Sequence, residues 1–431
     1  MKNKIITILL AGSLCLGIAG CGRQGENQES KSETGKNATD LMSEIKTLPE
    51  EDTTAEPADI SLFSKDTTDF AIALLQENLN EKSGNVMVSP VSVVTALAMS
   101  ANGAKEETLS QMLSVIGRNQ DLEELNANLR AWTNGLSATE DAGMKVANSI
   151  WFKDDEGKIQ VAADFLKKNA KYYAAGIYKA PFDESTLSEI NTWVSDHTDG
   201  MIGQILNEIP QEAVMYLVNA VAFEAKWQEI YNSTQIREGS FTNEDGQEKN
   251  VEFMHSKESI YFSDGRASGF VKPYQEGYRF VAVLPNEGIT PKEYAEELTG
   301  EHFARLLSDA REGVSVYAGM PKFEAEYDVE LKDVLTAMGM PDAFDEEKAD
   351  FSGLGTSAEG NIYVNKVLHK TYICVDEMGT KAGAATTVEI ATESAVMEEE
   401  VYFITLNRPF LYAIIEEETN IPLFIGVVNN L

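Results

Sequence analysis

The stretch 380–391 places the strongest constraint on the fold. It has the alternation of a strand, yet its side chains are too small to hold it in a hydrophobic core by their own burial. Its even positions are small or apolar and its odd positions accept charge, which is the period of a strand with one face against a core. Its Gly, Ala and Thr side chains bury little apolar area, so the isolated segment has little drive to fold. No proline falls between Pro341 and Pro409. The pattern is typical of a conformational switch, and an ordinary surface loop is the alternative.

Three motifs lie in and after this stretch: Glu-x-Gly-Thr-x-Ala-Gly-Ala-Ala-Thr (377–386), Asn-Arg-Pro-Phe (407–410) and Pro-Leu-Phe-Ile-Gly (422–426). They resemble the hinge and the C-terminal signature of the serpins, a family of serine protease inhibitors. The resemblance implies an α+β fold with a large mixed, mainly antiparallel main sheet, smaller sheets, surrounding helices and an exposed reactive loop. It also implies a suicide mechanism. A protease cleaves the loop, forms an acyl-enzyme and is trapped as the loop inserts into the main sheet.

The N-terminus has the pattern of a bacterial lipoprotein signal. Lys2 and Lys4 precede an apolar run, 5–18, which is short for a membrane span, and the run ends in Ile-Ala-Gly-Cys at Cys21. We therefore predict a signal peptide over 1–20 and lipid on Cys21, with a plain secretory signal as the alternative. The protein would be extracytoplasmic and lipid-anchored to a bacterial membrane or cell surface, and the sequence does not say which membrane.

Composition changes between the N-terminal region and the rest of the chain. Residues 21–59 are rich in Glu, Ser, Lys, Thr and Asn, which predicts a disordered acidic tether. From residue 60 to 431 the pattern is globular, and the serpin motifs follow in order along it. The formal net charge of −35 disfavours nucleic acid as a partner, because basic residues would have to neutralise its phosphates.

Cysteine and histidine usage argues against an enzyme. The cysteines are Cys15, Cys21 and Cys374, so no disulfide can form within the domain, and Cys374 in an apolar strand pattern is predicted to be inert core. Cys374 follows His369 by five positions, which on a strand places them on opposite faces and disfavours a catalytic dyad. The four histidines show no metal-binding spacing. We predict no catalytic residue and no metal site.

Several secondary-structure elements can be predicted from periodicity. Residues 85–92 read as a short strand entering a helix, with Pro90 in the first turn and Ser89 as its cap. Residues 146–152 and 216–223 read as buried strands. Residues 121–135 form an amphipathic helix whose exposed side has several acids and only Arg130 as a base. Serpins activated by heparin carry a basic cluster there, so we expect no glycosaminoglycan cofactor, and no other cofactor is predicted.

The serpin resemblance implies two structural clusters. A polar cluster, here called the shutter, lies where the main sheet opens and would comprise Ser89, Ser92, Asn219 and His369. A second cluster, the breach, lies where the loop enters the sheet and would comprise Trp227, Lys322 and Glu377. The alternative for Trp227 is simple core packing. The alternative for Lys322 and Glu377 is a surface salt bridge that contributes little to stability.

The hinge implied by the resemblance consists of small residues that could enter a tightly packed sheet. Its members are Glu377, Gly379, Thr380, Ala382, Gly383, Ala384 and Ala385. Lys381 replaces the acid usual in the family, but the alternation assigns it to the outward face.

The family's spacing from Glu377 predicts a reactive bond between Glu393 and Ser394. The downstream arm to Pro409 is longer than usual, so cleavage beside Met397 stays open, as does elastase-like attack near Thr392. A glutamate before the bond indicates a glutamate-preferring serine protease, with elastase- or chymotrypsin-like enzymes as alternatives.

Together these features predict a monomeric, membrane-tethered serpin that inhibits serine proteases outside the cell. A non-inhibitory serpin that is merely cleaved, and a binding lipoprotein, are the alternative functions.

Overall fold

The computed structural model describes residues 37–43, 45, 60–136, 142–154, 157–173, 176–380 and 400–431. From Asn37 to Leu431 the chain forms one compact unit, and the following description concerns that unit.

The main sheet has seven strands, and its central strands are buried on both faces. In spatial order the strands are β1 (Thr39–Asp40), β5 (Gly176–Ala180), β3 (Ala142–Lys153), β6 (Met215–Lys226), β15 (Gly379–Thr380), β14 (Lys366–Val375) and β12 (Phe323–Glu330).

Strand β6 shows why the main sheet is covered on two sides. Tyr216 and Val218 pack in one apolar cluster, whereas Leu217, Val221 and Phe223 pack in the other. Because side chains alternate along a strand, a continuous apolar run must be buried on both faces.

A second sheet has nine strands and supplies much of the remaining core. Its spatial order is β16 (Val401–Thr405), β11 (Arg311–Pro321), β8 (Glu248–Ser263), β9 (Ala267–Pro273), β10 (Tyr278–Pro285), β17 (Phe410–Glu416), β18 (Pro422–Val428) and β2 (Val86–Val88), with β7 (Ile236–Thr242) paired to β8. A two-stranded sheet joins β13 (Gly355–Ser357) to β4 (Ile159–Val161).

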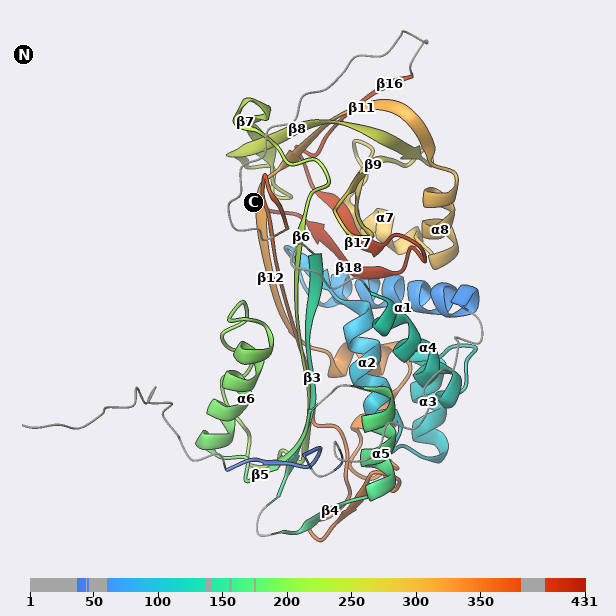
Figure 1. Cartoon of the computed structure of the whole chain (residues 1–431), viewed down its shortest axis with the longest axis vertical. Coiled ribbons are helices and arrows are strands. Elements are labelled where there is room, and N and C mark those ends of the chain that lie inside the picture. Colours follow the sequence, from blue (N-terminus) through green and yellow to red (C-terminus); the bar gives the residue numbers. More distant parts are fainter. Residues whose placement is uncertain are drawn as a thin grey trace, which may run out of the picture. The chain divides into compact units, whose positions relative to one another are not determined.

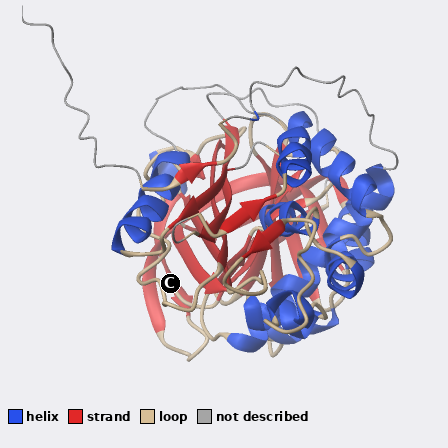
Figure 2. Ribbon diagram, turned by 90° about the horizontal axis from the view of Figure 1, so that it is seen from below, coloured by secondary structure: helices blue, strands red, loops and turns tan. Residues whose placement is uncertain are grey.

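The helices cover the sheets from outside (Figure 2). Those described are α1 (Ile60–Glu81), α2 (Pro90–Ala101), α3 (Glu106–Ile116), α4 (Leu122–Gly135), α5 (Ala163–Tyr172), α6 (Glu184–His197), α7 (Pro291–Glu297), α8 (Gly300–Ser308) and α9 (Lys332–Met338). Helix α6 lies on one face of the main sheet, and α2 lies on the opposite face with α1, α3, α4 and α5 beyond it (Figure 1). The predicted α+β fold is confirmed. None of the described helices has both the length and the apolar character needed to cross a bilayer.

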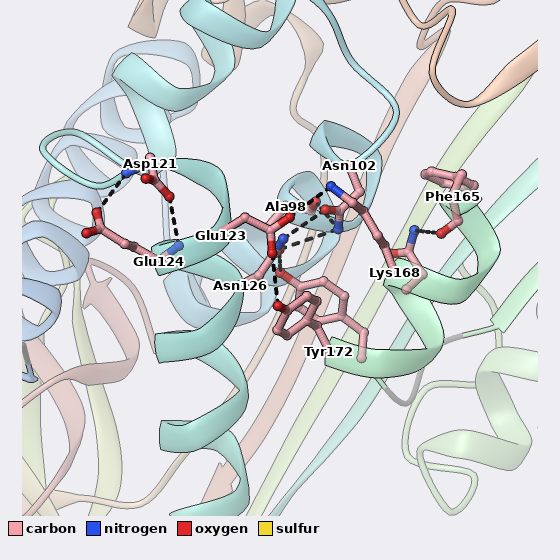
Figure 3. A network of polar contacts seen from close by, with 11 residues as sticks. Ala98, Asn102, Asp121, Glu123, Glu124, Asn126, Phe165, Lys168 and Tyr172 are labelled. Carbon is pink, nitrogen blue, oxygen red and sulfur yellow. Dashed lines mark hydrogen bonds and ion pairs between the residues drawn. The ribbon is translucent and has the colours of Figure 1, made fainter. Parts of the chain in front are cut away.

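Helix α4 is fixed at its start by charge and in its middle by amides (Figure 3). The Asp121 side chain accepts from the Glu124 N–H while the Glu124 carboxylate accepts from the Asp121 N–H, a reciprocal cap. Inside, Asn126 donates to Asn102 of the α2 C-terminus over 2.8 Å. Glu123 pairs with Lys168 of α5 at 2.9 Å. The exposed carboxylates at the start of this helix agree with the acidic surface expected from the sequence.

The predicted tether is not disordered over residues 37–43, which the structure describes. Strand β1 adds antiparallel to the edge strand β5, with Thr39 opposite Lys179 and Asp40 opposite Tyr178. The side chain of Met42 is buried in the main core. The N–H groups of Asn37 and Ala38 both donate to the Glu189 carboxylate on α6. Their polar composition predicts a tether, but these residues cover an open sheet edge.

The prediction that Cys374 lies in the core is also wrong. It is half-buried on the face of β14 opposite to the buried side chains of Ile373 and Val375, so it does not fill the core. Burial raises the pKa of its thiol, and the nearby carboxylates of Asp376 and Glu324 raise it further. The thiolate is therefore disfavoured, which suppresses nucleophilic reactivity.

Candidate functional site

The candidate site is the seam between β6 and β14 in the middle of the main sheet. Over 366–372 these two strands pair directly and in parallel, from Lys366 opposite Tyr216 to Tyr372 opposite Ala222. Beyond Tyr372 they part, and β15 lies between them. The two strands are thus paired directly with each other along most of the seam and separated by β15 at one end.

Strand β15 is antiparallel to both of its neighbours. Thr380 lies opposite Val375 of β14 and opposite Ala225 of β6, and Gly379 lies opposite Lys226. A strand occupying the whole seam would have this orientation. The first two residues of such a strand are therefore already in place.

A tight turn connects β14 to β15 and is held by one carboxylate. Asp376 Oδ1 accepts from the N–H of Met378 at 2.8 Å and of Gly379 at 3.2 Å, and the Asp376 N–H donates to the Gly379 carbonyl. A Cβ added to Gly379 would lie 2.0 Å from the Ala225 carbonyl oxygen. Only glycine allows the chain to approach β6 this closely.

Trp227 lies directly under this turn. Its Nε1 donates to the Asp376 carbonyl at 2.8 Å, and its backbone N–H donates to the Met378 carbonyl at 2.9 Å. Its ring stacks on Tyr274 at 4.2 Å, and the Tyr274 hydroxyl is 2.6 Å from Thr380 Oγ1. Trp227 is thus both fully buried core and a direct hydrogen-bond partner of the turn.

Lys322 joins the hinge to the second sheet. Its Nζ lies 2.7 Å from Glu377 Oε2 and 3.1 Å from Glu252 Oε2. The hydrogen bond from Lys322 holds the pKa of Glu377 below its ordinary value. The ion pair expected from the sequence is present, and Glu252 is a second carboxylate that the sequence did not indicate.

A buried ion pair beneath the breach was not predicted. Lys272 Nζ lies 3.0 Å from Glu258 Oε1, and the two side chains are 2% and 7% exposed. The ammonium group also lies 5.4 Å from the Trp227 ring centre and 4.4 Å from that of Tyr231. The two residues stand on neighbouring strands β8 and β9. Each charge satisfies the other where water is excluded.

The four shutter residues meet at the closed part of the seam. His369 of β14 and Asn219 of β6 lie opposite each other, and His369 Nδ1 hydrogen-bonds to Asn219 Oδ1. Asn219 Nδ2 donates to Ser92 Oγ and to Asn148 Oδ1. Asn148, on β3, was not in the predicted set, although a lone amide in an apolar strand was a visible signal. The cluster therefore joins three strands to α2.

Ser89 takes part in a way the sequence did not predict. It holds the N-cap position of α2, but its side chain makes no capping bond. Its backbone N–H instead donates to His369 Nε2 at 3.1 Å. Because Nε2 accepts, His369 carries its proton on Nδ1 and is neutral. Burial lowers the pKa of His369 to about 3.

This shift predicts that acid weakens the native state. An unfolded histidine has a pKa of about 6.5, so between about pH 6.5 and pH 3 the unfolded chain binds a proton that the native chain does not. Native stability contributed by His369 is present above that window and is lost as the pH falls through it, by roughly 1 kcal/mol at pH 5.5. Melting curves at pH 7.5 and 5.0 should show a smaller pH effect for His369→Gln than for wild type. Equal pH effects would contradict the assignment.

Several predicted residues lie outside the described part of the chain, and their roles stay predictions. They are Cys21, Ala382, Gly383, Ala384, Ala385, Thr392, Glu393, Ser394 and Met397. Within the described residues, no group of three or more His, Cys, Asp or Glu side chains is placed to hold a metal ion.

Comparison with known sequences places this geometry in context. The family model described as "Serpin (serine protease inhibitor)" matches residues 65–431. Human "Serpin B9" is 31% identical over 372 residues, covering 83% of this chain and 96% of the relative. Mouse "Leukocyte elastase inhibitor A" is 30% identical over 393 residues, covering 85% of this chain and 98% of the relative.

Solved structures of one thermophilic serpin, Tengpin, distinguish two states. Its native state matches this structure with a TM-score of 0.86 at 44% identity, covering 92% of this chain and all of that one. Its latent state matches with a TM-score of 0.76 at 45% identity, covering 87% and 99%. The present structure is closer to the native form.

Proposed function

The chain belongs to the serpin family, and we propose that it inhibits serine proteases as a suicide substrate, by inserting its cleaved loop between β6 and β14. One observation carries the proposal: β15 occupies one end of a seam whose remainder is closed only by a parallel ladder of seven pairs. Insertion would replace that ladder by two antiparallel ladders, which are slightly more stable per residue.

The register of β15 predicts where the inserted residues would go. Thr380 lies opposite Ala225 and Val375, and each step along the loop moves one residue back along both neighbours. Six steps bring Thr386 opposite Asn219 on β6 and His369 on β14. A polar side chain would therefore arrive where the shutter residues separate and lose their mutual hydrogen bonds.

The intervening residues fit the same register. Ala382 would lie opposite Phe223 and Ala384 opposite Val221, both on the face that packs toward the main core. Opposite residues in an antiparallel ladder share a face, so small side chains are required there. The ladder could continue to about residue 389, which would lie opposite Lys366, the first residue of β14.

The proposed target is a serine protease that cuts between Glu393 and Ser394, with attack near Thr392 or Met397 as the alternatives. A glutamate-preferring enzyme would have to supply charge-assisted hydrogen bonds to the Glu393 carboxylate. The name of the mouse relative points to elastase as a second class to test.

The test is to incubate the chain from residue 22 onward with a glutamyl endopeptidase, pancreatic elastase and chymotrypsin. We expect a detergent-stable complex with one of them. We also expect a released C-terminal fragment whose mass shows that it begins at Ser394. Cleavage by all three without any stable complex would identify a non-inhibitory serpin. A fragment beginning at Glu398 would move the reactive bond to Met397 and the target class toward chymotrypsin-like enzymes.

We also propose that Cys21 carries lipid and that the protein is held outside the cell on a bacterial membrane. Cys21→Ser should then release the protein from the membrane fraction or block its processing, because the acyl chains provide the anchor. Fractionation with mass spectrometry of the mature N-terminus checks this. A variant that is processed normally and stays membrane-bound would contradict it.

A further inference from the structure

Apolar side chains gather at one place on the surface of the described residues. Of the four large hydrophobic residues that these expose, three lie together on β11 and β16: Tyr317 is 49% exposed, Val401 48% and Phe403 78%. Tyr317 and Phe403 are opposite each other in the ladder, and their rings stack at 5.3 Å with 15° between the planes. We call these three residues the aromatic patch.

The aromatic patch is not needed to hold β16 in the sheet. The opposite face of that strand already does so, because Ile404 is buried and Tyr402 stacks on Tyr261 at 3.7 Å. A phenylalanine that remains 78% exposed gains little from folding and costs solubility. Exposed apolar groups clustered on an otherwise strongly acidic chain mark an interaction surface.

The position of the patch indicates what covers it. Strand β16 starts at Val401, two residues after the undescribed segment 381–399 that contains the predicted reactive bond. Ser394 to Val401 is a stretch that can span at most about 25 Å. A protease domain of about 230 residues is about 45 Å across, so a protease engaged at the bond extends well beyond that distance.

We propose that Tyr317, Val401 and Phe403 form a docking surface for the protease engaged at the reactive loop. This rests on the proposed function and adds a determinant of specificity outside the loop. The preferred partner is a serine protease with an exposed apolar rim beside its active-site cleft. The stacked pair is held rigidly on two strands, so it offers contact area at a small entropic cost, which is typical of aromatic anchors in interfaces.

The test compares Phe403→Ser and Tyr317→Ser with wild type, and Ile60→Ser serves as the matched control. Ile60 is the fourth exposed hydrophobic residue and lies at the start of α1, outside the patch. The quantity measured is the second-order rate constant for consumption of the intact chain by glutamyl endopeptidase, elastase and chymotrypsin. Consumption counts both trapped and merely cleaved product, so the rate reports docking even if no complex forms.

We expect Phe403→Ser to slow consumption by at least one protease about tenfold, with a smaller effect for Tyr317→Ser and none for Ile60→Ser. The protease should cleave a free peptide spanning 388–399 at the same rate whichever variant is present in the reaction. The fraction of encounters that end in a stable complex should not change, because trapping depends on the hinge. Melting temperatures confirm that the variants are folded.

The outcomes separate the two proposals. If Phe403→Ser is consumed more slowly than wild type, and wild type forms no stable complex, docking is supported and inhibition is rejected. A wild type that traps proteases, with equal rates for all variants, would overturn docking alone. The open edge of β16 could instead bind a second copy of the chain. If sedimentation shows a wild-type dimer that Phe403→Ser dissociates while its consumption rate is unchanged, docking of a protease is overturned in favour of self-association.

Discussion

Thr380→Arg should convert the chain from an inhibitor into a substrate of the same protease. Thr380 is fully buried, its hydroxyl lies 2.6 Å from that of Tyr274, and it sits between Ala225 and Val375. An arginine there would bring a charge with no partner into the seam, at a cost of several kcal/mol. Loop insertion would then start too slowly to trap the acyl-enzyme. The measured result is cleaved chain and active protease, with the stable complex lost.

Thr380→Ser is the matched control for this change. It keeps a small side chain and the hydroxyl that contacts Tyr274, so it should trap the protease nearly as well as wild type. Undiminished complex formation by Thr380→Arg would show that insertion at β15 is not required. Loss of the complex in both variants would indicate a requirement for the threonine itself rather than for a small uncharged group.

Glu258→Gln should cost the native state about 3–5 kcal/mol, the usual penalty for removing one partner of a buried ion pair. The Lys272 ammonium would keep its two aromatic faces but lose the charge that compensates it in a site that excludes water. The melting temperature should fall by several degrees. A shift of less than one degree would mean that the pair adds little to the stability of the region under Trp227.

Two comparisons make this prediction specific. Adding Lys272→Met to Glu258→Gln removes the stranded charge, so the double variant should be more stable than Glu258→Gln alone. Glu359→Gln breaks the exposed pair with Lys158, whose charged atoms are 2.7 Å apart, and should leave the melting temperature almost unchanged.

Local patterns in the sequence predict elements better than they predict partners. The apolar run around Asn219 predicts a buried strand, and the resemblance brings Asn219 together with Ser89, Ser92 and His369. The contact of β15 with two strands at once depends on pairing between residues more than a hundred positions apart. Periodicity contains no information about such pairing.

The errors have the same physical origin. The apolar neighbours of Cys374 predict a core position, yet a strand has two faces and only pairing decides which one is covered. Lys272 follows an apolar run, whereas Glu258 lies in a polar run on a separate strand, and nothing local shows that the two charges face each other. Residues 37–45 have the composition of a linker, but the open edge of β5 provides a partner that composition cannot reveal.

The most direct test of loop insertion is a pair of thermal melts, taken before and after the chain is cut within 391–397. Insertion adds a strand hydrogen-bonded on both sides and fills the seam between β6 and β14. We therefore expect the cleaved wild type to melt at a much higher temperature than the intact chain, and cleaved Thr380→Arg to show little or no increase. An unchanged or lower melting temperature for the cleaved wild type would contradict insertion and with it the proposed mechanism of inhibition.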